Sequence, residues 1–406
     1  AMLGKYPNAW LGTTDLSKCY PSLGLGPSLQ SVCWIKDPRS DTTWRGTGPK
    51  SAAWIAFHAK RKAEGIRYPP YRRCSGVALG LKVAPAFACG ISGEIVQFLT
   101  AIGITSTMYV DDLLIAASTR EQCAEDMATA VSVFEWLGLR CNPDKQVGPA
   151  RRLKYLGLII DVDLKTVSID DDRRLDLRRE LLRFQQSTSF GTKDLETLIG
   201  KLSFASCVVK GGQAFTYRLR VCLRAALDAS STTVDVSDAA RADAIWWADT
   251  LATSVGGSSI FLADTDLPVI TFKSDAAGEI GWGYVLDGTM YYSRWKASTI
   301  TDKHIQYKEL VALVHVLEEH GELFSNKIVR AGCDNASVCY CANKLSSRCP
   351  TLMSLLRRLA NSMCAHNTDL VAVHVSREFN ELADLLTRHQ ALADFRQLLP
   401  SGVATP

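Results

Sequence analysis

The chain has 406 residues, of which 47% are hydrophobic and 22% are charged, a composition typical of folded globular domains rather than disordered or fibrous chains. Its 46 lysines and arginines against 42 aspartates and glutamates give a net charge of +4, so charge alone does not indicate a nucleic-acid partner. No apolar run reaches the roughly 18 residues of a membrane span, and the length predicts about two or three domains.

The cysteine pattern indicates reduced thiols. Thirteen cysteines is an odd number, so they cannot all pair within the chain, and no Cys-x-x-Cys spacing is present to suggest a zinc ribbon or a redox motif. We therefore expect a reducing, intracellular compartment, either the cytoplasm or the nucleus.

The first half of the chain changes from mixed α/β patterning to helical patterning. Residues 1–160 combine short apolar runs with glycine and proline turns, which favours strands alternating with helices. Residues 171–227 show helical spacing, and a helix is expected to begin near Thr192 as its N-cap, with Asp194 in its first turn. The small and polar residues 229–236 indicate a linker.

From residue 268 onward the pattern predicts a sheet covered by helices. Apolar and polar residues alternate on both sides of Asp287-Gly288, which is a strong signal for a β-hairpin. Helical spacing follows from Leu310 to Leu317 and ends at Gly321. The remaining elements are expected in the order strand, two helices, strand and helix, over residues 328–333, 337–344, 352–363, 370–375 and 381–388.

Two adjacent carboxylates, Asp111 and Asp112, lie between two strand-forming runs. At the tip of a hairpin such neighbours repel each other unless a positive charge separates them, and a divalent metal ion supplies that charge. A polar turn without a metal is the other interpretation, because aspartate is common in turns. The pair therefore needs support from elsewhere in the chain.

Other segments supply that support, because together with this pair they resemble the palm motifs of reverse transcriptases. The resemblance implies RNA-templated DNA synthesis, with an RNA template, a DNA primer and dNTPs as partners and no membrane. It covers residues 10–161 and is carried by Asp15 to Tyr20, Gly80 to Phe87, Tyr109 to Asp112, Asn142 to Lys145 and Lys154 to Ile160.

The same resemblance implies the catalytic groups of the palm. Asp15, Asp111 and Asp112 would be the metal-binding carboxylates. They would hold two Mg²⁺ ions, or Mn²⁺ ions, that activate the primer 3′-hydroxyl and stabilise the leaving pyrophosphate.

Contacts to the nucleotide and the primer are implied as well. Tyr20 matches the sugar gate that excludes a ribose 2′-hydroxyl, although a core or surface tyrosine is the other interpretation. Gly80 and Lys82 match the loop under the incoming nucleotide, and Lys145 matches a lysine near the pyrophosphate or is a solvated loop lysine. The primer grip would be formed by Tyr155, Leu156 and Gly157.

A second group of acids occupies the last third of the chain. Two of them follow apolar strands, where an unpaired carboxylate is costly, and four acids that converge would make a two-metal site. Four unrelated surface acids are the other interpretation. The order and spacing resemble the ribonuclease H fold throughout residues 268–390. This implies hydrolysis of RNA in an RNA–DNA hybrid by the metal-binding quartet Asp275, Glu309, Asp334 and Asp384.

A histidine accompanies this quartet. His374 lies ten residues before Asp384, where many members of the family place a catalytic histidine, although it is also placed to end a strand. The tract from His374 through Arg388 is most similar to DIRS-like and related retrotransposon enzymes. Those enzymes usually have Pro-Gly where this chain has Ser376-Arg377.

Taken together, the resemblances predict an α/β (α+β) multidomain protein. A partial polymerase palm is expected over residues 1–161 and a mostly helical thumb and connection over residues 162–265, whose arginine-rich segment 173–183 would face a duplex. A ribonuclease H-like domain with a mixed five-stranded sheet and helices is expected over residues 266–392, and a tail over residues 393–406.

The position of Asp15 affects the expected activity. Only 14 residues precede it, where reverse transcriptases place a fingers region, so we expect weak or absent primer extension beside a complete ribonuclease H region. A non-catalytic nucleic-acid-binding remnant, or a domesticated element, is the alternative function. The sequence leaves the host, the natural template, the oligomeric state and proteolytic processing open.

Overall fold

The protein has a mixed α/β fold, which confirms the predicted class. The computed structural model describes residues 8–16, 19, 23, 34–36, 71–73, 82, 84–252, 258–259, 269–295 and 303–388. Contacts between residues divide the chain into two compact units, residues 1–156 and residues 157–406. Among the described helices, none is both long enough and apolar enough to cross a membrane, and every described cysteine is a free thiol.

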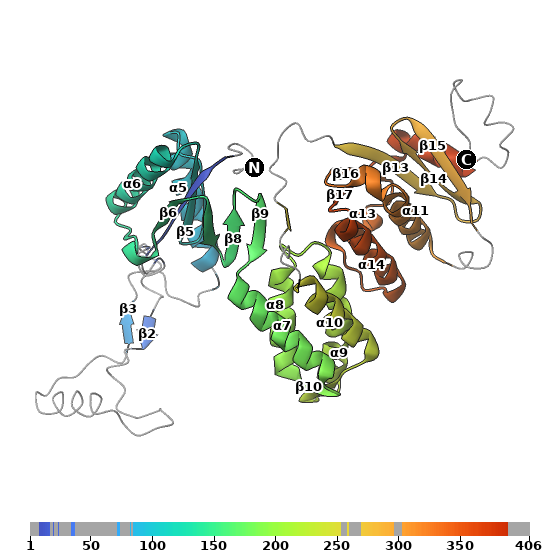
Figure 1. Cartoon of the computed structure of the whole chain (residues 1–406), viewed down its shortest axis with the longest axis horizontal. Coiled ribbons are helices and arrows are strands. Elements are labelled where there is room, and N and C mark those ends of the chain that lie inside the picture. The colour runs from blue at the N-terminus through green and yellow to red at the C-terminus, as the bar shows by residue number, and fades with distance from the viewer. Residues whose placement is uncertain are drawn as a thin grey trace, which may run out of the picture. The chain divides into compact units, whose positions relative to one another are not determined.

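An antiparallel four-stranded sheet forms the centre of the first unit (Figure 1). Helices α5 and α6 pack against it and bury Leu99, Leu113, Ile115 and Phe134. Gly12 allows the Met127 side chain of α6 to pack closely on β1, because a Cβ atom at residue 12 would collide with that side chain in its present position. The elements are β4 (Ser106–Tyr109), β5 (Asp112–Ala117), β1 (Trp10–Asp15) and β6 (Val147–Ala150) in sheet order, with α5 (Ala84–Ala101) and α6 (Arg120–Trp136).

Several smaller elements complete this unit. Strands β2 (Trp34–Lys36) and β3 (Tyr71–Arg73) form an antiparallel ribbon. The 3-10 turn η2 (Pro143–Lys145) precedes β6, and β7 (Arg152–Tyr155) follows it. Thr119 caps the start of α6, because its side-chain oxygen accepts a hydrogen bond from the backbone N–H of Gln122 at 3.1 Å.

The second unit begins with a small sheet and a helical region. Helix α8 begins at Thr192 as expected, but its N-cap is Gly191, because the Thr192 hydroxyl donates instead to the Ser231 carbonyl at 2.9 Å. The expected linker at 229–236 contains a strand, since the β-branched Thr233 and Val234 pair with a neighbouring strand and Val234 is buried. The elements are β8 (Leu158–Asp161), β9 (Thr166–Ile169), α7 (Asp171–Gln186), β10 (Ser189–Gly191), α8 (Thr192–Ala205), η3 (Gly212–Thr216), α9 (Tyr217–Asp228), β11 (Thr233–Asp235), α10 (Asp238–Thr250) and β12 (Ser258–Ser259).

A mixed five-stranded sheet occupies the C-terminal part of the second unit, as predicted. Three strands are antiparallel and the last two run parallel to β13 and to each other. The hairpin turn is at Asp287 and Gly288, whose φ angles of 48° and 76° explain the Asp-Gly pair. In sheet order the strands are β15 (Thr289–Arg294), β14 (Gly281–Leu286), β13 (Ile270–Ala276), β16 (Ile328–Cys333) and β17 (Asp369–His374).

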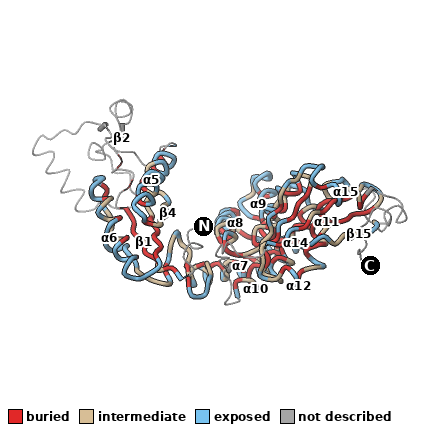
Figure 2. Tube along the Cα trace, turned by 90° about the horizontal axis from the view of Figure 1, so that it is seen from above, coloured by how far each residue is buried: buried red, intermediate tan, exposed pale blue. Residues whose placement is uncertain are grey.

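Helices pack against this sheet and join it to the helical region in one hydrophobic core. Figure 2 shows buried residues following the strands and the inner sides of these helices. Trp247 is fully buried, and Trp246 stacks on Phe215 with 3.9 Å between ring centroids. The elements are α11 (Ile305–Glu319), α12 (Gly321–Phe324), α13 (Ala336–Lys344), α14 (Pro350–Ala365), η4 (Arg377–Asn380) and α15 (Glu381–Arg388).

A buried ion pair crosses this core. The Asp243 carboxylate of α10 is fully buried and accepts a hydrogen bond from the Arg357 guanidinium of α14 and another from the Arg218 backbone N–H at 3.3 Å. Burial raises the pKa of Asp243 to about 6 and lowers the pKa of Arg357, although each partner favours the charge on the other. The two shifts agree that taking both charges out of water is costly.

Removing one partner should therefore be strongly destabilising. We expect Arg357→Met to lower the free energy of unfolding by about 3–5 kcal/mol, because Asp243 is then a buried charge without its main partner. Urea unfolding followed by circular dichroism measures the change. Arg358→Met, one residue further along α14, breaks the more exposed pair with Glu318 and should cost less than about 1 kcal/mol. If both variants lose the same free energy of unfolding, the buried pair contributes no more to stability than the exposed pair.

Candidate active sites

Backbone pairing in the first unit brings together the three palm carboxylates. β1 and β5 are antiparallel with Asp15 opposite Asp112, and β4 and β5 form the hairpin whose tip holds Asp111. Val110 adopts a φ of 57° in that tip, and its carbonyl accepts a hydrogen bond from the Ser92 hydroxyl of α5 at 2.7 Å. One carboxylate oxygen from each acid lies within 4.8 Å of those of the other two.

Negative charge is incompletely balanced in this cluster. Burial, followed by the neighbouring Asp15, raises the pKa of Asp111, and burial followed by Asp111 raises the pKa of Asp112. The Oδ1 atom of Asp15 is buried and has no hydrogen-bond partner among the residues that the structure describes. A cation between these oxygens would supply the missing partner, so the residues fit a divalent metal ion.

The structure places several of the other predicted palm residues. Lys145 in η2 forms an ion pair with Asp15 through its ammonium group, and this contact raises the pKa of Lys145. The Tyr155 hydroxyl donates to the Asp112 carbonyl at 3.1 Å. Leu156 and Gly157 form the turn between β7 and β8 with φ angles of 49° and 79°.

Not every predicted nucleotide contact is brought to the cluster. Lys82 is exposed just before α5, and the structure gives it no contact with the three carboxylates. Tyr20 and Gly80 lie outside the described residues.

In the second unit, four acids from four elements line one cavity of about 530 Å³. Asp275 comes from β13 and Asp334 follows β16, so the parallel strand pair places both at the same edge of the sheet. Glu309 comes from α11 and Asp384 from α15. Asp275 and Glu309 are only 5% and 4% exposed, so neither is an ordinary surface acid.

Burial, and after it the neighbouring acids, raises the pKa of two carboxyl groups in this cavity. Burial, followed by Asp275 and Asp334, raises the pKa of Glu309 to about 9. Burial also raises the pKa of Asp275, and Asp334 and Asp384 raise it further. Carboxyl groups with these shifts are held together against their charge, which is a common feature of functional sites. Oxygen ligands at a buried, repulsive cluster again fit hard divalent ions.

Three further residues of this cavity region were not found from the sequence. The Thr387 hydroxyl donates to Asp275 Oδ2 at 2.7 Å, and Arg377 approaches Asp334 with 3.6 Å between Nε and Oδ2. The buried Cys333 thiol lies 3.8 Å from Glu309 Oε2 and forms a compact group with Glu309 and Asp334. The spacing of Thr387 three residues after Asp384 on one helix was a usable signal. No comparable signal existed for Arg377 and Cys333, because their positions beside the acids depend on the residues at which β16 and β17 end.

His374 is the last residue of β17 and also lines the cavity. Its Nε2 atom lies 3.1 Å from the Asp334 carbonyl, and its side chain is exposed. Both interpretations of this residue, a strand end and a cavity residue, are therefore compatible with its position.

The arginine-rich helix α7 was expected to face a duplex. Two of its arginines are already in ion pairs within the chain, since Arg179 pairs with Asp176 and Arg183 pairs with Asp194.

Comparison with known sequences finds a match over the part of the chain that holds the first carboxylate cluster. Residues 5–160 match the family described as reverse transcriptase (RNA-dependent DNA polymerase). Protein P of Duck hepatitis B virus (strain China) is 23% identical over 164 residues, which are 40% of this chain and 20% of that protein. The match thus spans about a fifth of the viral protein's length.

Solved structures show similarity over most of the chain. A foamy viral protease-reverse transcriptase in complex with double-stranded DNA has a TM-score of 0.48 at 13% identity, covering 92% of this chain and 59% of the other. A foamy viral protease-reverse transcriptase in complex with an RNA/DNA hybrid has a TM-score of 0.44 at 12% identity, covering 95% and 68% of the two chains.

Neutralising Glu309 should stabilise the metal-free protein. Its pKa is raised from 4.5 to about 9, so the wild type loses stability as the pH rises between these values, and Glu309→Gln removes that loss. We expect a gain of about 1–3 kcal/mol at pH 8 in EDTA and little change at pH 4.5. Each kcal/mol should raise the melting temperature by about 2–4 °C.

The exposed Glu322 provides the matched control. Glu322→Gln on α12 removes a carboxylate without changing the cavity and should leave the melting temperature unchanged. If Glu309→Gln melts at or below the wild-type temperature at pH 8, burial and the neighbouring acids do not raise the pKa of Glu309 as described.

Proposed function

We propose that this chain is the reverse transcriptase and ribonuclease H region of a retroelement, most similar to DIRS-like retrotransposons. The observation that supports it best is the presence of two separate carboxylate clusters in one chain, each at the ends of buried strands. The first cluster would serve RNA-templated DNA synthesis and the second would hydrolyse RNA in an RNA–DNA hybrid. An RNA template, a DNA primer, the hybrid and dNTPs are the proposed partners.

At the second site the protein's own groups would position the hybrid. Asp275, Glu309, Asp334 and Asp384 would hold two Mg²⁺ ions, which when bound polarise a water molecule and stabilise charge on the leaving oxygen. Thr387 keeps Asp275 in one orientation through its hydrogen bond. Arg377, 70% exposed at the cavity, is placed to contact a phosphate. His374 Nε2 would carry a proton to or from the reacting oxygens.

At the first site Asp15, Asp111 and Asp112 would hold the ions that DNA synthesis requires, which when bound lower the pKa of the primer 3′-hydroxyl and neutralise the triphosphate. Lys145 would exchange its ion pair with Asp15 for the leaving pyrophosphate. The Tyr155 hydrogen bond to Asp112 would fix the hairpin against the β7 turn. Tyr20, Gly80 and Lys82 are retained as proposed nucleotide contacts, and Leu156 and Gly157 as primer-grip residues.

Hybrid cleavage is the direct test of the second site. A labelled RNA–DNA hybrid should be cut in Mg²⁺ and not in EDTA, and Asp334→Asn should lower the rate at least about a hundredfold. Asp287→Asn is the matched control, since asparagine tolerates the left-handed turn at this exposed hairpin and should leave cleavage unchanged. Cleavage that persists in Asp334→Asn would refute the quartet. Hybrid binding without any cleavage would favour a non-catalytic remnant.

Primer extension tests the first site. Extension of a DNA primer on an RNA template is expected to be weak; where it is detected, it should require dNTPs and Mg²⁺, and Asp111→Asn should abolish it. Asp144→Asn alters an exposed carboxylate beside Lys145 and outside the cluster, so its extension rate should match the wild type. Hybrid cleavage should be unchanged in both variants. An Asp111→Asn variant that extends primers normally would show that the cluster is not the polymerase centre.

A further inference from the structure

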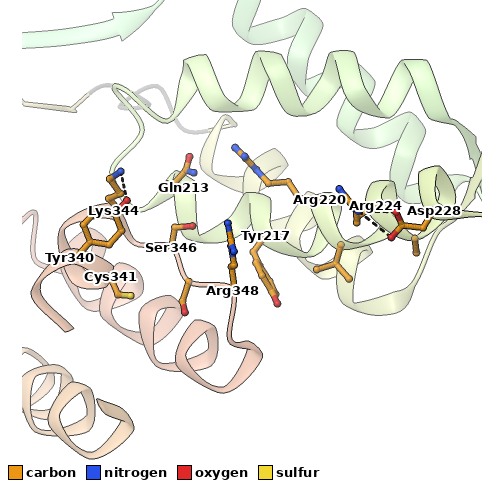
Figure 3. Close-up of a pocket in the computed structure, with 13 residues that line it drawn as sticks. Gln213, Tyr217, Arg220, Arg224, Asp228, Tyr340, Cys341, Lys344, Ser346 and Arg348 are labelled. Atoms are coloured by element: carbon orange, nitrogen blue, oxygen red, sulfur yellow. Dashed lines mark hydrogen bonds and ion pairs between the residues drawn. The ribbon is translucent and has the colours of Figure 1, made fainter. Parts of the chain in front are cut away.

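A groove beside α9 and α13 is separate from the carboxylate site. It has a volume of about 1020 Å³, against about 530 Å³ for the cavity that holds the four acids. One wall is α9 and the other is the end of α13 with the turn that follows it (Figure 3). No residue proposed for either catalytic site lines this groove.

The groove carries a concentration of positive charge. Its cations are Arg220, Arg224, Lys344 and Arg348, and its one acid is Asp228, so the described lining has a net charge of 4 − 1 = +3. Arg224 forms an ion pair with Asp228 at 2.9 Å. Arg348 forms no hydrogen bond or ion pair with any described residue, and Figure 3 shows its side chain directed from the turn toward α9. An arginine left in this way is available for an anionic ligand.

Aromatic rings accompany these cations on both walls. Tyr217 comes from α9, and Tyr340 comes from α13 with 59% of its surface exposed. The Lys344 ammonium lies 4.4 Å from the centroid of the Tyr340 ring and donates to its hydroxyl at 2.7 Å. This contact holds a cation and a ring together. Tyr217 is half-buried and packs partly on the core, so Tyr340 is the more accessible ring. Aromatic rings interleaved with arginine and lysine are the usual lining of surfaces that bind single-stranded nucleic acid.

We propose that this groove binds a single-stranded segment of nucleic acid, with its phosphates on Arg220 and Arg348 and its bases against Tyr217 and Tyr340. A single strand is favoured over a duplex because only unpaired bases present their faces to tyrosine rings. The size agrees, since a two-walled cavity of about 1020 Å³ admits a few nucleotides but not a double helix. The inference rests on the proposed function for the presence of nucleic acid, and it adds a site outside both carboxylate clusters.

Fluorescence anisotropy of the full chain with a labelled single-stranded oligonucleotide of about 12 nucleotides tests the proposal. Arg348→Gln combined with Tyr340→Leu should weaken binding at least tenfold, because a phosphate contact and a stacking contact are lost together. The slope of log affinity against log salt should become shallower by about 0.7. Affinity for a blunt duplex of the same length should not change.

Matched variants separate a lost contact from a lost fold. Arg358→Gln removes a cation from α14 outside the groove and should bind the single strand as the wild type does. Arg348→Lys with Tyr340 intact keeps the charge and the ring and should retain most of the affinity. An unchanged affinity in the double variant, or an equal loss for the duplex, would overturn the proposal.

Hybrid cleavage, measured in parallel, distinguishes this proposal from the proposed function. A wild-type chain that cuts hybrid while the double variant binds single strands normally would refute the groove alone. A wild-type chain that cuts no hybrid but loses single-strand affinity in the double variant would refute the hydrolytic function and support the groove.

Discussion

Repulsion between carboxylates at the ends of buried strands is the constraint on which both candidate sites depend. Asp15 faces Asp112 because β1 and β5 are paired in register, and Asp275 and Asp334 share a sheet edge because β13 and β16 are parallel. Neither arrangement is favourable by itself, since burial and neighbouring charge raise the pKa of Asp111, Asp275 and Glu309. The sheets must therefore be stable enough to hold these groups together, and the surrounding hydrophobic cores provide that stability.

The two sites balance this repulsion differently. At the first site a lysine is in direct contact with Asp15, yet the other oxygen of that carboxylate is buried without a partner among the described residues. At the second site a hydroxyl from Thr387 and a more distant guanidinium from Arg377 take the place of the lysine. A flexible lysine can leave with a phosphate group, whereas a threonine fixed on α15 can only orient its neighbour. Under the proposed function, the first arrangement would suit the release of a charged product, and the second would suit a site that must keep its shape through hydrolysis.

Many of the elements could be predicted from local sequence. The features that could not be predicted depend on contacts between residues far apart in the chain. The Asp287-Gly288 turn, the alternation around it and the helical spacing after Leu310 specify the C-terminal elements with little outside help, and the structure confirms them. Thr233 and Val234 looked like linker residues because their pairing partners, Gly191 and Phe190, are more than 40 residues away. Cys333 was missed because strand alternation would point it away from Asp334, whereas β16 ends at Cys333. The pairing of Asp243 with Arg357 joins helices more than 100 residues apart and has no local signal.

That long-range pair also explains why a groove beside α9 and α13 can keep a defined width. Arg357 of α14 binds Asp243 of α10 and lies over the ring of Phe215, with 4.2 Å to its centroid, in the η3 turn that leads directly into α9. The other wall ends where α14 begins, since Arg348 is two residues before Pro350. One buried contact therefore anchors both walls, while their charged and aromatic side chains remain at the surface. Substitutions on the walls can change affinity for a ligand without moving the carboxylates of the sheet, because the frame that positions the two sets of residues is the shared core.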